Sequence, residues 1–456
     1  MSNFFECNIP MQAPGYISLD SRQKFNEMSA KIHQRTRKLN DALTFSGLEP
    51  NTFGEYAAVL FKNFRDRFDG MSAQTLAQSA LLLHDGQYEA IHRIEWPNAT
   101  VVVDCRFLTV EEWQVLRVIG IGGSDSSVLR DNMNPYRTPW ELYMDKTMAP
   151  EKYFAPGSDK KQAIFDRGHA VEDRVIEAFC EGMNARRIPE HRMFASKRYP
   201  HNTANIDAIV ELNGEFYVFE AKSSTQNNVE KWANGKIPSP YIPQMRQYPG
   251  VLDDDRVKGT FIGVLFTYDY KLNGFFVDAD FDKNMYRQRY MPRDKRMEET
   301  YLSQNEEWFQ KSVMAQRPPK WTGKPDAGIR AYTRYNGLSN PSAPEITLPE
   351  DVRDNVLRYL QYKDLRDAYK VKMQEAEDQM KTEQLEIIKQ MGTSEMAVMR
   401  SDASHVFEVK NSTRRRDNVD AEKLSTFYPD VYAECKKPIE FPSFSIKEKD
   451  IRKRRK

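Results

Sequence analysis

The sequence lacks the features that define several protein classes. None of its 456 residues fall in an apolar run of about 18 or more, so no membrane-spanning helix is expected. The four cysteines lie far apart and form no CxxC pair, which argues against a structural zinc site or a four-cysteine iron–sulfur cluster. The first residues show no secretion signal, and scattered thiols suit a reducing compartment, so we expect a cytoplasmic protein.

An excess of positive charge, which is common in proteins that bind nucleic acids, is also missing. Lys and Arg number 67 and Asp and Glu number 66, which gives a formal net charge of +1. Any surface for a nucleic acid must therefore be local. Hydrophobic residues make up 40% of the chain, which suits a folded protein of two or three domains.

Four regions are expected along the chain. Residues 1–112 are mostly helical and carry no recognisable chemistry, which is typical of an accessory or assembly region. Residues 113–315 alternate strand and helix signals and predict an α/β domain. Residues 316–347 are rich in Pro, Gly and Asn and predict a linker. Residues 348–456 predict a long helix, with the heptad-like spacing of a pairing surface, and a basic C-terminal tail.

The most informative segment is a predicted β-hairpin with the turn Asn213-Gly214, a typical tight-turn sequence. With this turn, Asp207 faces Glu220, and facing residues have Cβ atoms about 4.5–5.5 Å apart. Two carboxylates at that distance repel each other unless a divalent cation binds both. Lys222 lies two residues after Glu220 and therefore points to the same face.

This combination of side chains suits metal-assisted hydrolysis of a phosphodiester. Carboxylates bind Mg²⁺, or Mn²⁺ in its place, and the metal polarises the phosphate and lowers the pKa of a bound water. The lysine can orient that water or stabilise developing negative charge. The alternative is a surface hairpin with an ordinary Glu–Lys pair, because an E-x-K triplet alone is very common.

A third carboxylate is expected on the helix that precedes the hairpin. The spacing of Val171, Val175 and Phe179 predicts an amphipathic helix with Glu172 on the flank of its apolar stripe. A carboxylate there is costly unless it is paired or metal-bound. The alternative is an edge glutamate that reaches out to water. One turn earlier, His169 is more simply interpreted as a structural histidine than as a support for the site.

A glycine-rich turn, GIGGSD at residues 120–125, precedes another predicted helix. Ser124 and Asp125 are suitable N-cap residues for a helix that begins at Ser126. A turn of this kind can bind a phosphate, and the alternative is a tight turn with an ordinary N-cap. Its spacing matches neither the dinucleotide-binding motif nor the phosphate-binding loop for nucleoside triphosphates, so nucleotide binding is not indicated.

Together these segments resemble the YqaJ-like viral recombinase nucleases, a family related to lambda exonuclease within the PD-(D/E)xK superfamily. The matching motifs occur in order from residue 116 to about residue 270, and together they are specific although each is short. They are Arg117, Ile121 and Ser124 in R-x-x-x-I-x-x-S; NPYRTPWELYMDK at 134–146; Arg167, Gly168 and Glu172 in R-G-x-x-x-E; Ile206-Asp207; E-A-K at 220–222; and I-P-x-x-Y-x-x-Q ending at Gln244.

The resemblance implies an active site. Asp207 and Glu220 are expected to bind the metal, with Lys222 beside them. Glu172 is expected to assist from its helix as a further ligand, and Gln244 is expected to position the water or the metal. The implied fold is a PD-(D/E)xK core, a mixed β-sheet flanked by helices, here with a helical N-terminal region and a long C-terminal helix.

The resemblance also implies a substrate and partners. Arg117 and Ser124 are expected to bind the phosphate near the 5′ end of double-stranded DNA. The family degrades one strand from 5′ to 3′ and passes the 3′ overhang to a single-strand annealing protein. The lambda relative is a ring-shaped trimer, so a homo-oligomer is expected. A phage-encoded chain would act in the cytoplasm of the host cell.

Two other functions stay open at this point. One is an endonuclease with the same site, as in restriction or repair enzymes, and the other is a non-catalytic DNA-binding or assembly protein. The complete set of Asp207, Glu220 and Lys222 argues against the second of these. Two departures from the family pattern are notable: Pro249-Gly250 predicts a short or kinked helix after Gln244, and residues 1–112 lie outside the resemblance.

Overall fold

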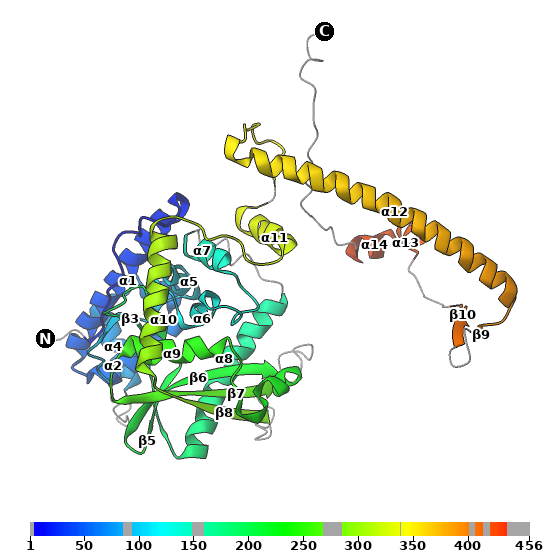
Figure 1. Ribbon diagram of the computed structural model, residues 1–456. Coiled ribbons are helices and arrows are strands. Elements are labelled where there is room, and N and C mark those ends of the chain that lie inside the picture. The colour runs from blue at the N-terminus through cyan, green and yellow to red at the C-terminus, as the bar shows by residue number, and fades with distance from the viewer. Residues whose placement is uncertain are drawn as a thin grey trace, which may run out of the picture. The chain divides into compact units, whose positions relative to one another are not determined.

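The computed structural model describes residues 4–84, 94–147, 159–267, 285–337, 339–400, 406–413 and 420–435, with the backbone alone for residues 159–170, 400 and 406. The predicted role of His169 therefore lies outside the described side chains. The chain forms two units, Met1–Asn336 and Gly337–Lys456 (Figure 1). Among the described residues, no helix combines the length and apolar character needed to cross a membrane.

A five-stranded mixed sheet is the centre of the first unit. Its strands are, in spatial order, β2 (Arg186–Ile188), β5 (Ala208–Leu212), β6 (Glu215–Thr225), β7 (Val257–Thr267) and β8 (Tyr286–Pro292). Neighbouring strands are antiparallel except β6 and β7, which are parallel. A parallel pair needs a crossover connection, and the helix between these two strands supplies it.

Two helices sandwich this sheet. On one face, α8 (Asp159–Met183) packs Val175 and Phe179 against Phe219 of β6. On the other face, α9 (Tyr241–Leu252) packs against Val218 and the strands beside it. Both faces are therefore covered, and the predicted mixed sheet flanked by helices is confirmed.

The proline inside α9 has a specific compensation. Pro249 cannot donate a backbone hydrogen bond to the carbonyl of Met245, and a proline in a helix interior usually kinks or breaks it. The Thr260 hydroxyl of β7 donates to that carbonyl at 2.8 Å. The helix accordingly continues past Pro249 and ends at Leu252, where Asp253 takes up the left-handed conformation.

A second sheet and several short helices carry the glycine-rich turn. The three antiparallel strands are β1 (Ala99–Asp104), β3 (Arg192–Ser196) and β4 (Thr203–Asn205). The helical segments are α5 (Val110–Leu116), a 3₁₀ turn at Arg117–Ile119, α6 (Gly123–Ser126), a 3₁₀ turn at Ser127–Leu129 and α7 (Pro139–Thr147). Farther along the chain are α10 (Lys295–Trp308) and α11 (Pro325–Asn336).

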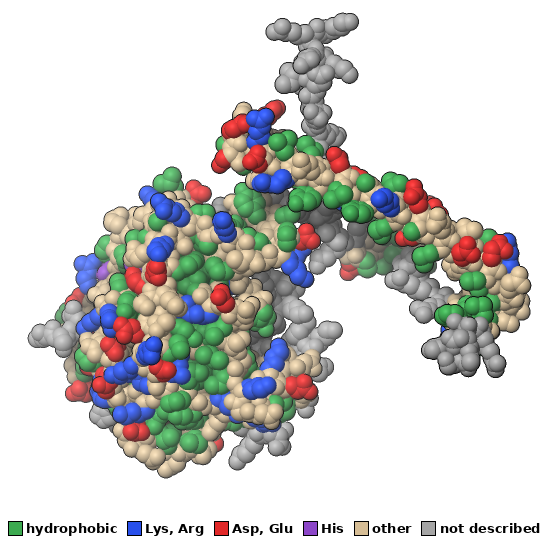
Figure 2. Space-filling model, in the orientation of Figure 1, with side chains coloured by type: hydrophobic (Ala, Val, Ile, Leu, Met, Phe, Trp, Pro, Cys, Tyr) green, Lys and Arg blue, Asp and Glu red, His purple; other side chains and the backbone are tan. Residues whose placement is uncertain are grey.

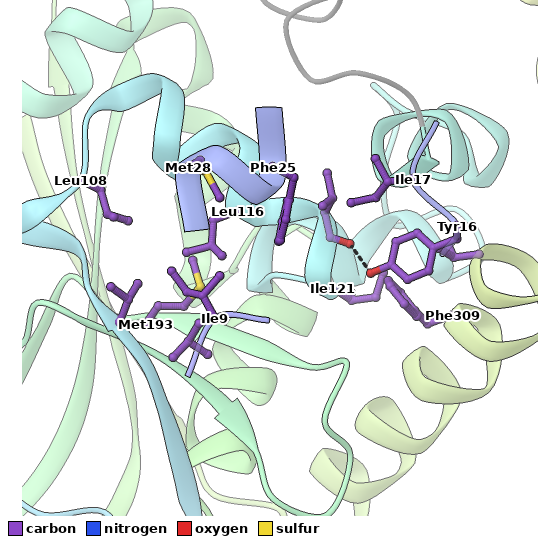
Figure 3. Close-up of a cluster of buried hydrophobic side chains, with 14 of the residues drawn as sticks. Ile9, Tyr16, Ile17, Phe25, Met28, Leu108, Leu116, Ile121, Met193 and Phe309 are labelled. Carbon is purple, nitrogen blue, oxygen red and sulfur yellow. Dashed lines mark hydrogen bonds between the residues drawn. The ribbon is translucent and has the colours of Figure 1, made fainter. Parts of the chain in front are cut away.

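The N-terminal region is helical, as predicted, and shares a core with the glycine-rich turn. Its helices are α1 (Leu19–Ser46), α2 (Pro50–Asn63), α3 (Arg65–Phe68) and α4 (Ala73–Leu83). Phe25 of α1 lies in one apolar cluster with Leu116 and Ile121, and the Tyr16 hydroxyl donates to the Val118 carbonyl at 3.1 Å (Figure 3). Residues before and after position 112 therefore belong to one compact unit.

The predicted linker contains a helix that packs on the first unit. In α11, the Tyr335 hydroxyl donates to Asp145 of α7 at 2.8 Å, and Arg334 forms an ion pair with Glu141 at 2.8 Å. Trp140 of α7 contacts the Tyr335 ring at a centroid distance of 5.7 Å. The first unit accordingly ends after this helix, at Asn336.

The second unit contains the long helix that the sequence predicts. Its elements are α12 (Arg353–Met391), the hairpin of β9 (Met396–Arg400) and β10 (Val406–Lys410), α13 (Ala421–Phe427) and α14 (Pro429–Cys435). Hydrophobic side chains are exposed along α12 (Figure 2), and its predicted seam includes Tyr369, Met373 and Met380. Among the described residues of α12, Met391 alone is buried.

Candidate active site

The predicted hairpin is confirmed in its turn and its register. Asn213 and Gly214 both have positive φ angles, 53° and 80°, as a tight hairpin turn requires. The strand pairing runs from Leu212–Glu215 at the turn to Ala208–Phe219. Asp207 directly precedes this ladder, and its Oδ2 accepts a hydrogen bond from the backbone N–H of Ala221 at 2.8 Å.

Glu220 is the most buried of the candidate residues, with 1% of its surface exposed. Its Oε1 accepts hydrogen bonds from the Lys222 ammonium and, at 2.5 Å, from Nε2 of Gln244. Its other oxygen, Oε2, is buried and has no hydrogen-bond partner within the described part of the chain. A buried carboxylate oxygen without a partner is costly, so this atom is suited to a ligand that supplies positive charge.

The three carboxylates lie within electrostatic range of one another. Burial and then the charge of Asp207 raise the pKa of Glu220 to about 8, against the opposing effect of Lys222. Burial and Asp207 likewise raise the pKa of Glu172 to about 7. Glu172, on α8, is thus brought next to the hairpin, and Glu172 and Glu220 are destabilised in their charged forms.

The chemistry of this group fits a hard divalent cation. Its donors are carboxylate oxygens, which Mg²⁺ and Mn²⁺ prefer, and among the described side chains no cysteine or histidine belongs to it. A cation would remove the repulsion between Asp207 and Glu220 and would satisfy Oε2 of Glu220. Within the described residues, however, no three such side chains already converge as a preformed metal cluster.

Helix α9 supplies the remaining side chains of the site. Gln244 is buried and also donates to the Tyr248 hydroxyl, at 2.7 Å. The Tyr241 ring lies 5.7 Å from the Lys222 ammonium, within the range of a cation–π contact. One face of the first turns of α9 therefore holds both Glu220 and Lys222 in place.

Tyr248 is a residue that the sequence reasoning missed. Its ring lies against the glycine-rich turn, where a Cβ at Gly123 would come within 2.5 Å of Cε1. Glycine at position 123 thus allows Tyr248 to lie between the turn and Gln244. The available signal was spacing, because Tyr248 follows Gln244 by four residues and so lies on the same helical face.

Around the turn, a buried acid binds three cations. Asp125 is fully buried, and its Oδ1 accepts from both Arg117 and Arg137, each at 3.2 Å. Its Oδ2 accepts from the Lys146 ammonium at 2.8 Å. Burial alone would raise the pKa of Asp125, but these three cations lower it overall. Arg137 and Lys146 were not singled out from the sequence, although both belong to the motif NPYRTPWELYMDK.

The predicted start of the following helix was wrong. Helix α6 spans only Gly123–Ser126, with Gly122 at its N-cap, and Asp125 lies inside it and accepts from the Gly122 N–H at 3.2 Å. Asp125 is drawn inward by its cationic partners, so it cannot cap a helix that begins at Ser126. Ser124 is exposed on this turn. Because α6 has four residues, the charged side chains rather than a helix dipole dominate the local field.

Sequence comparisons agree with the motifs. Residues 112–251 match the YqaJ-like viral recombinase domain. The YqaJ protein of Bacillus subtilis (strain 168) is 26% identical over 353 residues, which are 77% of this chain and 98% of that protein. The matched domain contains every candidate residue from Arg117 to Gln244.

Two solved structures are also similar, both of LHK-Exo, an alkaline exonuclease from Laribacter hongkongensis. One of them is a complex with dAMP. They are 16% and 14% identical to this chain, each with a TM-score of 0.34. The similarity covers 46% of this chain and 94% of each of those chains.

Proposed function

We propose that this chain, which carries a YqaJ-like viral recombinase domain at residues 112–251, is a metal-dependent nuclease that hydrolyses phosphodiester bonds of duplex DNA. The observation that carries the proposal is the buried Oε2 of Glu220, which lacks a partner within the described residues and lies in a group of mutually repelling carboxylates. A structural salt bridge with Lys222 would satisfy only Oε1.

In this proposal, Asp207, Glu220 and Glu172 hold Mg²⁺, or Mn²⁺ in its place. The bound cation would polarise the scissile phosphate and lower the pKa of a water molecule. Lys222 places its ammonium beside Glu220, where it can stabilise negative charge on the phosphate oxygens. Gln244 holds Oε1 of Glu220 and leaves Oε2 for the metal.

The remaining parts of the proposal follow the family resemblance. The chain acts as a 5′→3′ exonuclease, with Arg117 and Ser124 on the phosphate near the 5′ end. It passes the 3′ overhang to a single-strand annealing protein in the host cytoplasm and works as a homo-oligomer, with a trimer as the expected form. Tyr248 lies against Gly123 of the glycine-rich turn and accepts a hydrogen bond from Gln244, so the turn is close to the proposed metal site. This proximity supports recognition of the DNA end. An endonuclease with the same site is the alternative.

Digestion of linear and closed circular duplex DNA distinguishes these functions. With Mg²⁺, the protein should degrade the linear form and leave closed circles intact, and EDTA should abolish the reaction. Cleavage of closed circles would indicate the endonuclease. Undiminished activity in EDTA, or no cleavage of either DNA with Mg²⁺ or Mn²⁺, would refute the metal-dependent nuclease.

A further inference from the structure

We propose that Arg137 is a second phosphate-binding residue, and that Asp125 positions it beside Arg117 as a two-arginine clamp for the 5′-terminal phosphate of the DNA. This inference rests on the proposed function and extends it to a specificity determinant. Both guanidinium groups lie 3.2 Å from the same atom, Oδ1 of Asp125, so they converge on one point.

The two arginines are partly exposed, whereas Asp125 and Lys146 form a buried ion pair beside them. Asp125 and Lys146 have 0% and 3% of their side-chain surface exposed, whereas Arg117 and Arg137 have 32% and 28%. Lys146 donates to Oδ2 of Asp125 at 2.8 Å and to the Arg117 carbonyl at 2.8 Å. The buried pair is therefore inaccessible to a ligand, while Arg117 and Arg137 each keep part of their side chain exposed.

The basic side chains at the clamp outnumber the carboxylates that contact them. Lys146 neutralises Asp125. Among the described residues, the other carboxylate in contact with the two arginines is that of Asp145, which binds Nη2 of Arg137 at 2.5 Å. Nε of Arg137 is buried and has no partner within the described residues. A terminal phosphate carries about −1.5 to −2 charges near neutral pH and presents several acceptor oxygens. Planar guanidinium groups bind such oxygens in pairs, so one phosphate can bridge both arginines.

The segment that carries Arg137 is fixed before any ligand binds. Oδ1 of Asn134 accepts from the backbone N–H groups of Tyr136 and Arg137 at 2.9 and 3.0 Å, and Nδ2 of Asn134 donates to Ser127 at 2.9 Å. On the far side of Arg137, Asp145 accepts from the Tyr335 hydroxyl at 2.8 Å. Because these hydrogen bonds already fix the segment, less conformational entropy is lost when Arg137 binds a phosphate.

Phosphate recognition can be measured apart from cleavage. Fluorescence anisotropy in EDTA would compare a linear duplex with 5′-phosphate ends to the same duplex with 5′-hydroxyl ends. The wild-type protein should bind the phosphorylated duplex more tightly. Arg137→Gln should weaken that binding about tenfold or more, which is the usual effect of losing a hydrogen bond between charged groups, so the ratio of the two affinities falls toward one.

Arg198→Gln is the matched control, because Arg198 is an exposed arginine paired with Glu299 outside the clamp. It should keep the wild-type ratio. Circular dichroism would verify folding, and if Arg137→Gln does not fold, Arg137→Lys takes its place, since it keeps the charge but loses the planar fork. A wild-type ratio in the folded Arg137 variant, or equal binding of both ends by the wild type, overturns the inference. Because no cleavage is needed, failure of the nuclease proposal would appear separately, in the digestion of linear duplex.

Discussion

At the scale of single residues, Glu220 is the centre of the proposed active site. Its burial and its position next to Asp207 make its negative charge unfavourable in the metal-free protein. Lys222 and Gln244 offset part of that cost through one oxygen alone. A site of this kind stabilises the protein less than neutral side chains would, and in the proposed function a bound cation would offset this cost.

Glu220→Gln separates a metal site from a structural ion pair. Cleavage of linear duplex should fall about a hundredfold or more, because a ligand is lost. The metal-free variant should be at least as heat-stable as the wild type, because the repulsion with Asp207 disappears. Mg²⁺ should raise the wild-type melting temperature more than that of the variant. Glu211→Gln on the same hairpin is the control and should keep its activity, since Glu211 pairs with Arg186 away from the site. A variant that is less stable yet active would contradict the metal site.

The pH dependence of the metal-free protein follows from the same carboxylates. In the folded state the pKa of Glu220 is raised from 4.5 to about 8 and that of Glu172 from 4.5 to about 7. The folded state therefore binds more protons than the unfolded state in this interval, so its stability should decrease as the pH rises from about 4.5 to about 8. Denaturant titrations in EDTA across this range measure the slope, and Glu220→Gln should flatten it. A rise in stability over the same range in wild type, or an unchanged slope in the variant, would argue against these shifts.

At the scale of elements, the glycine-rich turn and α9 act as one assembly. Gly123 brings the turn against Tyr248, and Tyr248 accepts the hydrogen bond of Gln244. The turn near the arginines is thereby connected to Glu220 through two side chains. A shift of either element would move Gln244 relative to the carboxylate that it holds.

Gly123→Ala tests this connection. The added methyl group would lie 2.5 Å from the Tyr248 ring, so one element must move, at a cost of about 1–3 kcal/mol in the free energy of unfolding. The rate of DNA cleavage should also fall, because Gln244 loses its orientation. Gly182→Ala near the end of α8 is the matched control, since a Cβ there meets nothing within 4 Å. Chemical denaturation and a cleavage assay would check both variants, and equal behaviour of the two would contradict the contact.

At the scale of the whole molecule, the first unit is held together by a core that spans distant parts of the chain. Phe25 and Ile17 from the N-terminal region share an apolar cluster with Leu116, Ile121 and Phe309. The N-terminal helices therefore support the segment that carries Arg117 directly.

Phe25→Ala should consequently destabilise the active site along with the N-terminal helices. Removal of a fully buried phenylalanine costs about 3–5 kcal/mol, whereas Phe45→Ala on the same helix, at a side chain that is 55% exposed, should cost about 0.5 kcal/mol or less. Melting followed by circular dichroism should coincide with thermal loss of cleavage in both proteins. Loss of helix at a temperature where cleavage persists would show that the region folds independently.

The amino-acid sequence by itself determined the local features of this protein. The Asn213-Gly214 turn sets the register of the hairpin, because side chains on paired strands alternate with a period of two. This register pairs Ala208 with Phe219 and so brings Asp207 to the end of the ladder, next to Glu220. The spacing of Val175 and Phe179 likewise identified the buried face of α8. The ordered motifs pointed to the matched domain for the same reason, since each depends on neighbours in the chain.

The tertiary structure decided the contacts between segments that are distant in sequence. Arg137 and Lys146 join Arg117 around Asp125, Tyr248 packs on Gly123, and the N-terminal helices share the core of the domain. Local periodicity carries no information about such partners, because they depend on which elements pack together and on which buried charges need neutralising. The same reason explains the wrong helix start: Asp125 had the local chemistry of an N-cap, but three distant cations and burial decided its place.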